Sequence, residues 1–412
     1  MAKPKVGIFT TFNSFDPAYS LVAVVQDQLA AHIIAGYTPV LFVLESFSDH
    51  KKVPVGVEVR AVIPQITLEP YQGMSYPDTW QEDAAQVAEA LREHASDIEV
   101  LITHDIIFID TYLPYNIGLR QAELKAKQFH WVHSAPSPRP VIEDNPHANR
   151  YTLPPNSKIV YLNHDKKVAV AEMYGVFPKD VRVIPNSRDP RLFWGLDNVT
   201  SQIIVETDLL KSDFVSVYPV STPRMVDGKQ IDVVIKIHEA LRALGHTTTL
   251  IVPNAHANAA AEKKEVEYRH SEHVFFTSKL GADYESGVPS EVVSNLFRLS
   301  NLFIFPSISE NCSLVLLEAM LAGNILVLNK DCSGLQEFGQ DNALYFPFGG
   351  LDMGQRRYEN ALINPQYYQD IAKIIVSEFE QNRALKAKRR ALQAHSLEAV
   401  FTKIENLYYE QN

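Results

Sequence analysis

The stretch "SDFVSVYPVS" (212–221) is followed by "IDVVIKIHEALRALGH" (231–246) and by "TTTLIVP" (247–253). The outer two segments are short apolar runs typical of strands, and the middle segment has apolar residues at helical spacing. Two strands joined through a helix favour a parallel sheet with helices on its faces. This stretch therefore predicts a doubly wound α/β domain in the second half of the chain.

The first half of the chain has the same rhythm. "KVGIFTTF" (5–12) predicts a buried strand, "SLVAVVQDQLAAHIIAGY" (20–37) a helix that ends near Gly36, and "TPVLFVLE" (38–45) the next strand. A helix is expected at 80–97, with further strands at 99–105, 128–134 and 158–163. The sequence thus predicts two Rossmann-like doubly wound domains, and ligands of such sheets bind at the carboxyl ends of the strands. We expect the two sheets to face an interdomain cleft.

The length of 412 residues fits two domains of about 200 residues each. A stretch rich in Pro, Asn and Asp (184–202) suits a connection between them. We expect a first domain at 1–190, a linker at 191–210, a second domain at 211–385 and a C-terminal segment at 386–412. The end of that segment, from Ser396 onward, has the pattern of a capped amphipathic helix.

Composition narrows the class of protein. The net charge of −11 argues against a broad basic face that wraps nucleic acid. Two cysteines, Cys312 and Cys332, cannot build a disulfide framework and fit a reducing compartment. The first residues lack the apolar core of a signal peptide, and no run reaches the roughly 20 apolar residues of a membrane span. We expect a cytoplasmic protein without integral membrane association.

The segment "SISENCSLVLLEAMLAGN" (307–324) places Glu310 just before an apolar run and Glu318 inside it. A carboxylate within an apolar helix face is costly unless a partner satisfies it. We expect Glu310 in the loop before a helix, with the N–H groups of residues 311–313 pointing into the cleft as an anion site. The constellation suits a ligand that carries both phosphate and hydroxyl groups.

Two cations follow the first strand of the second domain. Arg224 and Lys229 lie five residues apart where a loop turns into a helix, and such a pair suits a diphosphate. His133 is expected at the carboxyl end of a first-domain strand. Simpler explanations stay open for each residue: Glu310 as a helix cap, Glu318 paired with a lysine, the cations as surface charge and His133 as a structural histidine.

As a set, these residues resemble the retaining GT-B glycosyltransferases of the family 4 type. Glu310 and Glu318 match the E-x7-E signature of that family. Arg224 and Lys229 are spaced as in its phosphate loop, and "VIPNSRDPRLF" (183–193) is similar to its interdomain linker. The resemblance implies a GT-B fold, with two Rossmann-like domains.

The resemblance is specific from about 183 to 340. In the first domain it rests on the alternation of strands and helices and on His133. The final helix, within 386–412, resembles the family's C-terminal helix, which packs back on the N-terminal domain. Two departures concern loops. The loop at 10–20 has no glycine where the family usually has several, and Pro223 stands where a glycine usually precedes the arginine.

The resemblance implies a hexosyl- or pentosyltransferase that uses a nucleoside diphosphate sugar as donor substrate, retains the anomeric configuration and needs no cofactor. Arg224 and Lys229 would neutralise the leaving diphosphate. Glu310 would bind hydroxyls of the donor sugar, Glu318 would bind the ribose, and His133 would contact the donor sugar or a phosphate. The phosphate site would also use the amides of Asn311, Cys312 and Ser313, and the nucleobase would lie beside Ser278 and Lys279.

No metal is expected, because the sequence has neither an Asp-x-Asp pair nor a Cys/His cluster. The acceptor stays open: a glycan, a small molecule or a hydroxymethylated nucleic-acid base. Two loops, 69–80 and 133–151, could shape its pocket. The basic helix at 382–395 could meet a polyanion or a membrane surface, or could be a solvated face. Two further alternatives are a sugar-nucleotide-binding protein without catalysis and a sugar-nucleotide epimerase.

Overall fold

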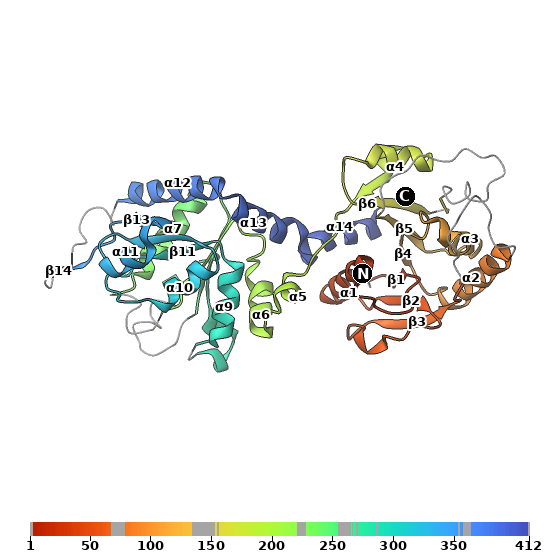
Figure 1. The fold of residues 1–412 in the computed structure, drawn as a ribbon, viewed down its shortest axis with the longest axis horizontal. Helices are drawn as coiled ribbons and strands as arrows, with labels where there is room; N and C mark the ends of the chain where they lie inside the picture. The colour runs from red at the N-terminus through yellow and green to blue at the C-terminus, as the bar shows by residue number, and fades with distance from the viewer. Residues whose placement is uncertain are drawn as a thin grey trace. The chain divides into compact units, whose positions relative to one another are not determined.

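The structure is a computed structural model that describes residues 3–66, 79–133, 153–154, 156–220, 228–253, 265, 267–268, 271–285, 287–352, 355–356 and 364–410. The chain divides into two compact units. The first unit consists of Met1–Asp189 and His395–Asn412, and the second of Pro190–Ala394. Each unit contains one parallel sheet flanked by helices (Figure 1).

The first unit is built on a seven-stranded parallel sheet in the order β3-β2-β1-β4-β5-β6-β7. Its strands are β1 (Val6–Phe9), β2 (Val40–Leu44), β3 (Glu58–Ile63), β4 (Val100–His104), β5 (Lys127–Val132), β6 (Ser157–Tyr161) and β7 (Val181–Val183). The order reverses between β1 and β4, which places a topological switch point there. β1, β2 and β4 are buried along their whole length, because helices cover both faces of the sheet.

Helices pack on both faces of this first sheet. They are α1 (Ser20–Ile34), α2 (Trp80–His94), α3 (Leu113–Gln121), α4 (Lys167–Tyr174) and α14 (Leu397–Tyr409), with short 3₁₀ turns at His50–Lys52, Asp110–Tyr112 and Pro178–Asp180. α1 and α14 share one apolar cluster with the sheet, and α2 and α3 share another.

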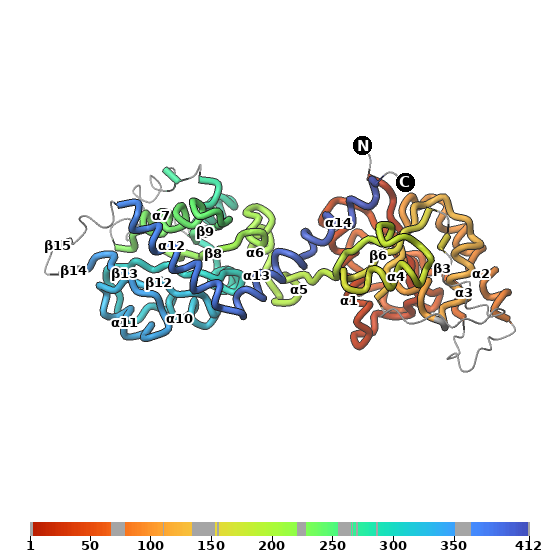
Figure 2. The backbone as a smooth tube through the Cα atoms, turned by 90° about the horizontal axis from the view of Figure 1, so that it is seen from above, coloured from red at the N-terminus to blue at the C-terminus, as the bar shows by residue number. Residues whose placement is uncertain are grey.

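The last helix of the chain is bonded to the first helix, beside which it runs in Figure 2. His32 Nε2 lies 2.6 Å from the hydroxyl of Tyr408, and the hydroxyl of Tyr37 donates to Glu405 Oε1 at 2.7 Å. The first unit is therefore assembled from both ends of the chain.

The second unit is built on a six-stranded parallel sheet in the order β10-β9-β8-β11-β12-β13. Its strands are β8 (Phe214–Val217), β9 (Thr248–Val252), β10 (Val274–Phe276), β11 (Leu302–Phe305), β12 (Ile325–Asn329) and β13 (Leu344–Phe346). A two-stranded antiparallel hairpin, β14 (Leu351–Asp352) and β15 (Gln355–Arg356), follows. The switch point of this sheet lies between β8 and β11.

Among the described residues, the helices of the second unit are α5 (Pro190–Trp194), α6 (Asn198–Thr207), α7 (Ile231–Ala243), α9 (Ser290–Leu299), α10 (Leu314–Leu321), α11 (Ser333–Gly339), α12 (Pro365–Gln381) and α13 (Arg383–His395). Short 3₁₀ turns lie at Thr277–Leu280, Ala282–Tyr284 and Gln340–Asn342. The stretch predicted as a linker, 191–210, thus forms α5 and α6. Asp197 caps α6 by accepting a hydrogen bond from the Thr200 N–H at 2.8 Å.

The basic helix α13 holds the second unit together through Arg389, whose side chain is 1% exposed. Its guanidinium donates to the carbonyls of Leu299 at 3.3 Å and Leu209 at 3.0 Å. Lys388 donates to the carbonyl of Ser300 at 2.7 Å. Two of the five basic residues of this segment therefore serve the fold and do not form a solvated cationic face.

The predicted α/β fold class is confirmed: the chain has two Rossmann-like, doubly wound parallel sheets with helices on both faces. Within the described residues, no helix combines the length and the apolar character that crossing a membrane requires.

Candidate functional site

The carboxyl edge of the second sheet brings Lys229 and Glu310 together. Lys229 follows β8 and precedes α7, and Glu310 lies in the loop between β11 and α10. The two strands flank the switch point, so their loops meet. Lys229 Nζ forms an ion pair with Glu310 Oε1, and the two side chains are 13% and 12% exposed. Two residues 81 positions apart in the sequence thus form one site.

Further contacts fix this ion pair. Ser307 Oγ donates to Glu310 Oε1 at 2.6 Å. Lys229 Nζ lies 4.6 Å from the centroid of the Phe305 ring, a cation–π distance. The backbone N–H of Ile308 donates to the Gly228 carbonyl at 3.1 Å and joins the two loops directly. Oε2 of Glu310 receives no hydrogen bond from the described part of the chain.

Gln230 sets the turn into α7. Its φ of 53° lies in the left-handed region, which non-glycine residues seldom occupy. Its side-chain amide donates to the carbonyls of Pro306 at 2.6 Å and Phe348 at 3.1 Å. The hydroxyl of Tyr218 donates to the carbonyl of Lys229. These contacts offset the cost of the turn and hold Lys229 at the edge of the sheet.

Asn329, at the end of β12, ties neighbouring loops together. Its amide donates to the carbonyls of Ser307 at 3.0 Å and Gly349 at 2.6 Å. Its carbonyl oxygen accepts from the backbone N–H groups of Asp331 at 3.0 Å and Phe348 at 2.9 Å. Asn329 is not among the predicted site residues, although a polar residue that ends the apolar run "NILVLN" is a signal of such a position.

Gly334 allows a close approach between the start of α11 and the loop that carries Glu310. A Cβ atom at this position would overlap the carbonyl oxygen of Glu310 and lie 3.0 Å from that of Asn311. Cys332, two residues earlier, places its Sγ 4.0 Å from the Glu310 carbonyl. No local sequence pattern indicates this contact, because the two partners come from different loops.

The helix after Glu310 begins where the sequence predicts. Ser313 is the N-cap of α10, and its hydroxyl accepts from the Leu316 N–H at 3.4 Å. Asn311 and Cys312, just before it, are exposed. The predicted positions 311–313 thus form the turn that leads into the amino end of α10.

Glu318 lies on α10 and is partly buried. Burial raises the pKa of its carboxyl above the usual value. Across the described ranges, no cation forms an ion pair with this carboxylate, so the predicted alternative of a lysine partner is not seen there. The group is a partly desolvated acceptor on the helix that follows Glu310.

Of three other predicted residues, the structure describes two, Ser278 and Lys279. Arg224 lies outside the described residues. Ser278 and Lys279 lie in the 3₁₀ turn after β10, on the same carboxyl edge as the ion pair but at the edge strand of the sheet. Lys279 Nζ lies 5.9 Å from the centroid of the Phe275 ring. These two residues are separated from Lys229 by β9.

His133 belongs to the first unit, where it follows β5. Its Nε2 lies 2.9 Å from His104 Nδ1, and its backbone N–H donates to Asp105 Oδ1 at 2.8 Å. Burial lowers the pKa of His133 to about 4, so its ring is neutral at pH 7. The partners His104 and Asp105 were not predicted as site residues.

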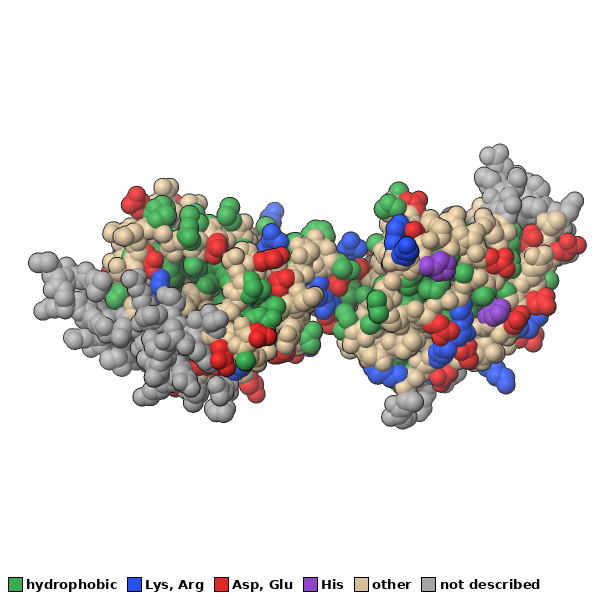
Figure 3. Space-filling view, turned by 90° about the horizontal axis from the view of Figure 1, so that it is seen from below, with side chains coloured by type: hydrophobic (Ala, Val, Ile, Leu, Met, Phe, Trp, Pro, Cys, Tyr) green, Lys and Arg blue, Asp and Glu red, His purple; other side chains and the backbone are tan. Residues whose placement is uncertain are grey.

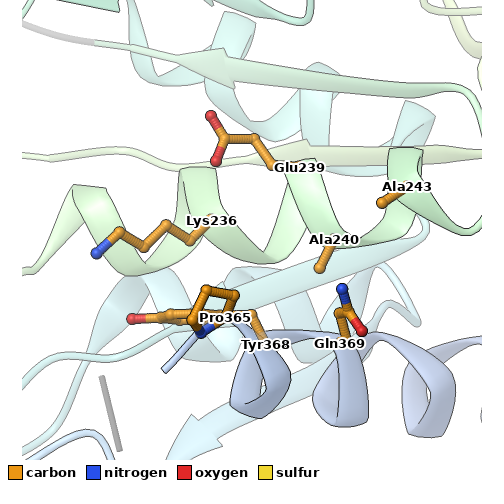
Figure 4. A pocket seen from close by; sticks show the side chains of 7 residues that line it. All are labelled: Lys236, Glu239, Ala240, Ala243, Pro365, Tyr368 and Gln369. Carbon is orange, nitrogen blue, oxygen red and sulfur yellow. The ribbon is translucent and has the colours of Figure 1, made fainter. Parts of the chain in front are cut away.

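Other features of the surface lie apart from these residues. A pocket of about 300 Å³ lies between α7 and α12, and its rim includes Lys236, Glu239, Tyr368 and Gln369 (Figure 4). It contains none of the predicted site residues. Over the described ranges, no three His, Cys, Asp or Glu side chains form a group suited to a metal ion. On the face shown in Figure 3, Lys and Arg side chains lie among Asp and Glu side chains on both units.

Comparisons with solved structures give long alignments at low similarity. A glycosyltransferase from Rickettsia africae aligns over 99% of this chain and 98% of its own, with 12% identity and a TM-score of 0.38. A sucrose-phosphate synthase from Thermosynechococcus elongatus aligns over 98% of each chain, with 16% identity and a TM-score of 0.37. The catalytic domain of starch synthase IV from Arabidopsis thaliana, bound to ADP and acarbose, aligns over 99% of each chain, with 13% identity and a TM-score of 0.38. No curated protein matches the sequence.

Residues 220–352 match the sequence model of a family described as glycosyl transferases group 1. The matched segment begins three residues after β8, ends with β14 and contains both members of the Lys229–Glu310 pair. It also contains Glu318 and Gly334. The match therefore indicates a glycosyltransferase domain within the second unit.

Proposed function

We propose that this protein is a retaining GT-B glycosyltransferase of the family 4 type that moves a sugar from a nucleoside diphosphate to an acceptor hydroxyl. One observation carries the proposal: the Lys229–Glu310 ion pair lies at the switch point of the second sheet, inside the segment that matches glycosyl transferases group 1. Ligands of open α/β sheets bind at that point.

In the free protein, Lys229 and Glu310 satisfy each other's charge, which avoids a partly buried unpaired ion. A bound diphosphate is a stronger anion than a carboxylate and would take over Lys229. Glu310 is then free to accept hydrogen bonds from the hydroxyls of the donor sugar. Lys229 and Glu310 thus pair with each other in the free protein and with the donor when it binds.

The reaction breaks the bond between the anomeric carbon and the diphosphate oxygen and forms a bond to the acceptor oxygen. The acceptor's proton passes to the leaving phosphate oxygen. Lys229, together with Arg224, would neutralise the charge that builds on the diphosphate, and electrostatic stabilisation of this kind usually contributes more to catalysis than any other single effect. No cofactor or metal takes part in this scheme.

The remaining predicted residues complete the donor site. Glu318, a desolvated acceptor, would hold the ribose hydroxyls. The amides at the start of α10 would add to the phosphate site. Ser278 and Lys279, at the edge of the same sheet, would lie beside the nucleobase.

The acceptor is proposed as a glycan or a small molecule in the cytoplasm. A hydroxymethylated nucleic-acid base is the second candidate. The net charge of −11 disfavours it, because a basic face supplies most of the affinity for nucleic acid, and the one face shown in Figure 3 carries charges of both signs.

A thermal-shift screen of nucleoside diphosphates and their sugars tests the proposal. A ligand that binds the folded state at about 100 times its Kd adds about 2.7 kcal/mol to the free energy of unfolding. We expect one base to be preferred, and the sugar nucleotide that raises Tm to be turned over when acceptors are supplied. A set of sugar nucleotides that never raises Tm would contradict the proposal. Binding without transfer, hydrolysis or epimerisation would favour a non-catalytic binding protein.

A further inference from the structure

A buried relay of three side chains ends at His133. Gln28, on α1, places its Oε1 3.0 Å from His104 Nε2, and His104 Nδ1 lies 2.9 Å from His133 Nε2. Gln28 and His104 are 4% and 2% exposed. The three residues come from α1, the end of β4 and the loop after β5, so the sequence gives no local sign that they meet.

The structure turns the carbonyl oxygen of the Gln28 amide, and not its NH2 group, toward His104, and this orientation sets the direction of the hydrogen bonds. A carbonyl oxygen accepts and cannot donate, so His104 carries its proton on Nε2. Nδ1 of a neutral His104 is then a lone pair, and His133 must donate to it from Nε2. The remaining ring nitrogen of His133, Nδ1, is left without a proton. Within the described ranges, Nδ1 of His133 has no partner.

We propose that Gln28 and His104 are positioning residues that fix the tautomer of His133, so that His133 Nδ1 accepts a hydrogen bond from a substrate hydroxyl. The inference rests on the proposed function for the identity of the substrate. The sequence leaves two roles open for His133, a contact with the donor sugar or with a phosphate. The relay selects the first, because a lone pair repels the oxygens of a phosphate.

The surroundings keep the ring in place. The backbone N–H of His133 is held by Asp105 Oδ1 at 2.8 Å, and Asp105 itself donates its backbone N–H to the Trp131 carbonyl at 2.8 Å. The rings of His104 and His133 have their centroids 5.2 Å apart and their planes 30° from parallel, which fits the contact between their ring nitrogens. Burial lowers the pKa of both rings, that of His133 to about 4, so neither ring takes up a second proton at neutral pH and the direction of the relay is preserved.

The first test reads the tautomers directly. Long-range ¹H–¹⁵N correlation spectra of the full-length protein, labelled at histidine nitrogens, separate protonated from unprotonated ring nitrogens. We expect a proton on Nε2 and none on Nδ1 of His133. In Gln28→Glu, a carboxylate beside His104 Nε2 favours the doubly protonated His104, which then donates from Nδ1. His133 should then switch to a proton on Nδ1.

Two controls separate this effect from misfolding. His238, in the second unit, lies 2.9 Å from Ser216 Oγ, and its signals should be unchanged in each variant that folds. His104→Phe removes the relay without adding charge and should leave His133 as a mixture of tautomers. A proton on Nδ1 of His133 in the wild type, or an unchanged tautomer in both variants, would overturn the proposal.

The second test uses the sugar nucleotide found by the screen and the matching nucleoside diphosphate. His133→Phe should weaken binding of the sugar nucleotide by about tenfold, the scale of one hydrogen bond, and leave the affinity for the diphosphate unchanged. His133→Asn places an oxygen near the position of Nδ1 and should restore most of the loss. An equal loss for both ligands would show a phosphate contact and overturn the proposal. If no sugar nucleotide binds at all, the proposed function fails, and the tautomer spectra still decide the relay.

Discussion

The carboxyl edges of the two sheets hold different groups, although six strands of the first sheet follow the same order as the six of the second. In the second unit, that edge holds an ion pair, Lys229 with Glu310. In the first unit, it holds a neutral relay that ends at His133. The same backbone topology thus carries a lysine–glutamate ion pair in one unit and, in the other, a chain of neutral side chains beside the carboxylate of Asp105. The comparison teaches that the side chains at the switch point, and not the fold, set the chemistry.

The largest expected effect compares how the two units respond to acid. Several buried histidines have a lowered pKa: in the first unit His32, His104, His130 and His133, and in the second unit His238 and His273. The unfolded chain binds these protons below pH about 6.5. In the folded chain, burial holds the pKa of each ring lower, at about 4 for His32 and His133 and about 3 for His130 and His238. Unfolding free energy therefore falls as pH drops below about 6.5, by about 1.4 kcal/mol per pH unit for each fully buried histidine. His273 is only partly buried and contributes less.

Asp27 works in the opposite direction, because burial raises its pKa to about 6 and acid relieves that cost. Even so, the first unit has more buried histidines and should lose about 2 kcal/mol more than the second between pH 7 and pH 5.5. Hydrogen exchange followed by mass spectrometry measures the protection of each unit separately. Equal loss in both units would contradict the assignment of neutral histidines to the first.

The next effect concerns the charged edge. Lys229→Met should lower kcat/KM by more than about 100-fold, because one charge contact to the leaving group is lost. Lys373→Met is the matched control, since Lys373 pairs with Asp370 on the surface of α12, 58% exposed. The control should leave activity unchanged. A loss below about threefold for Lys229→Met would mean that another cation holds the diphosphate.

A smaller effect tests the packing beneath Glu310. Gly334→Ala forces a Cβ atom against the Glu310 carbonyl, and such overpacking costs about 1 to 3 kcal/mol. We expect a lower denaturation midpoint and weaker donor binding together. The neighbouring Ser333→Ala, at an exposed position, controls for the change of side chain. If Gly334→Ala retains full stability and full activity, the contact is not a constraint on Glu310.

The smallest effect compares one helix cap from each unit. Asp197 caps α6 in the second unit, and Ser396 caps α14 in the first by accepting from the Ala399 N–H at 3.3 Å. Asp197→Ala and Ser396→Ala should each cost about 1 kcal/mol. Exchange rates should rise mainly in the unit that carries the change. A change that spreads equally through both units would show that they unfold as one.

The alternation of apolar strands and helices predicts the two sheets because each buried strand is a continuous apolar run, as in β8, β9 and β12. The half-exposed edge strand β3 escapes this signal, since Glu58 and Arg60 interrupt it. The number of basic residues in α13 does not predict a cationic surface, because Arg389 is buried and donates to backbone carbonyls of other segments.

Part of the candidate site is visible in the sequence and part is not. The spacing of Glu310 and Glu318 and the position of Lys229 after a strand are local patterns, and they lead to the charged edge. The partners of these residues depend on tertiary contacts. Asn329 acts across three loops, Gly334 acts through the side chain it lacks, and Gln28 reaches His104 across 76 positions. No window of the sequence contains such pairs.

The placement of α14 against α1 has a consequence for biosynthesis. Val22, Val25 and Leu29 of α1 point into an apolar cluster, and side chains of α14 complete that cluster. Residues 397–409 leave the ribosome after the whole of the second unit. During translation the second unit is therefore synthesised in full before the first unit has all of its residues. Until α14 is made, the apolar side of α1 stays uncovered. That interval is when a chaperone has the most to protect.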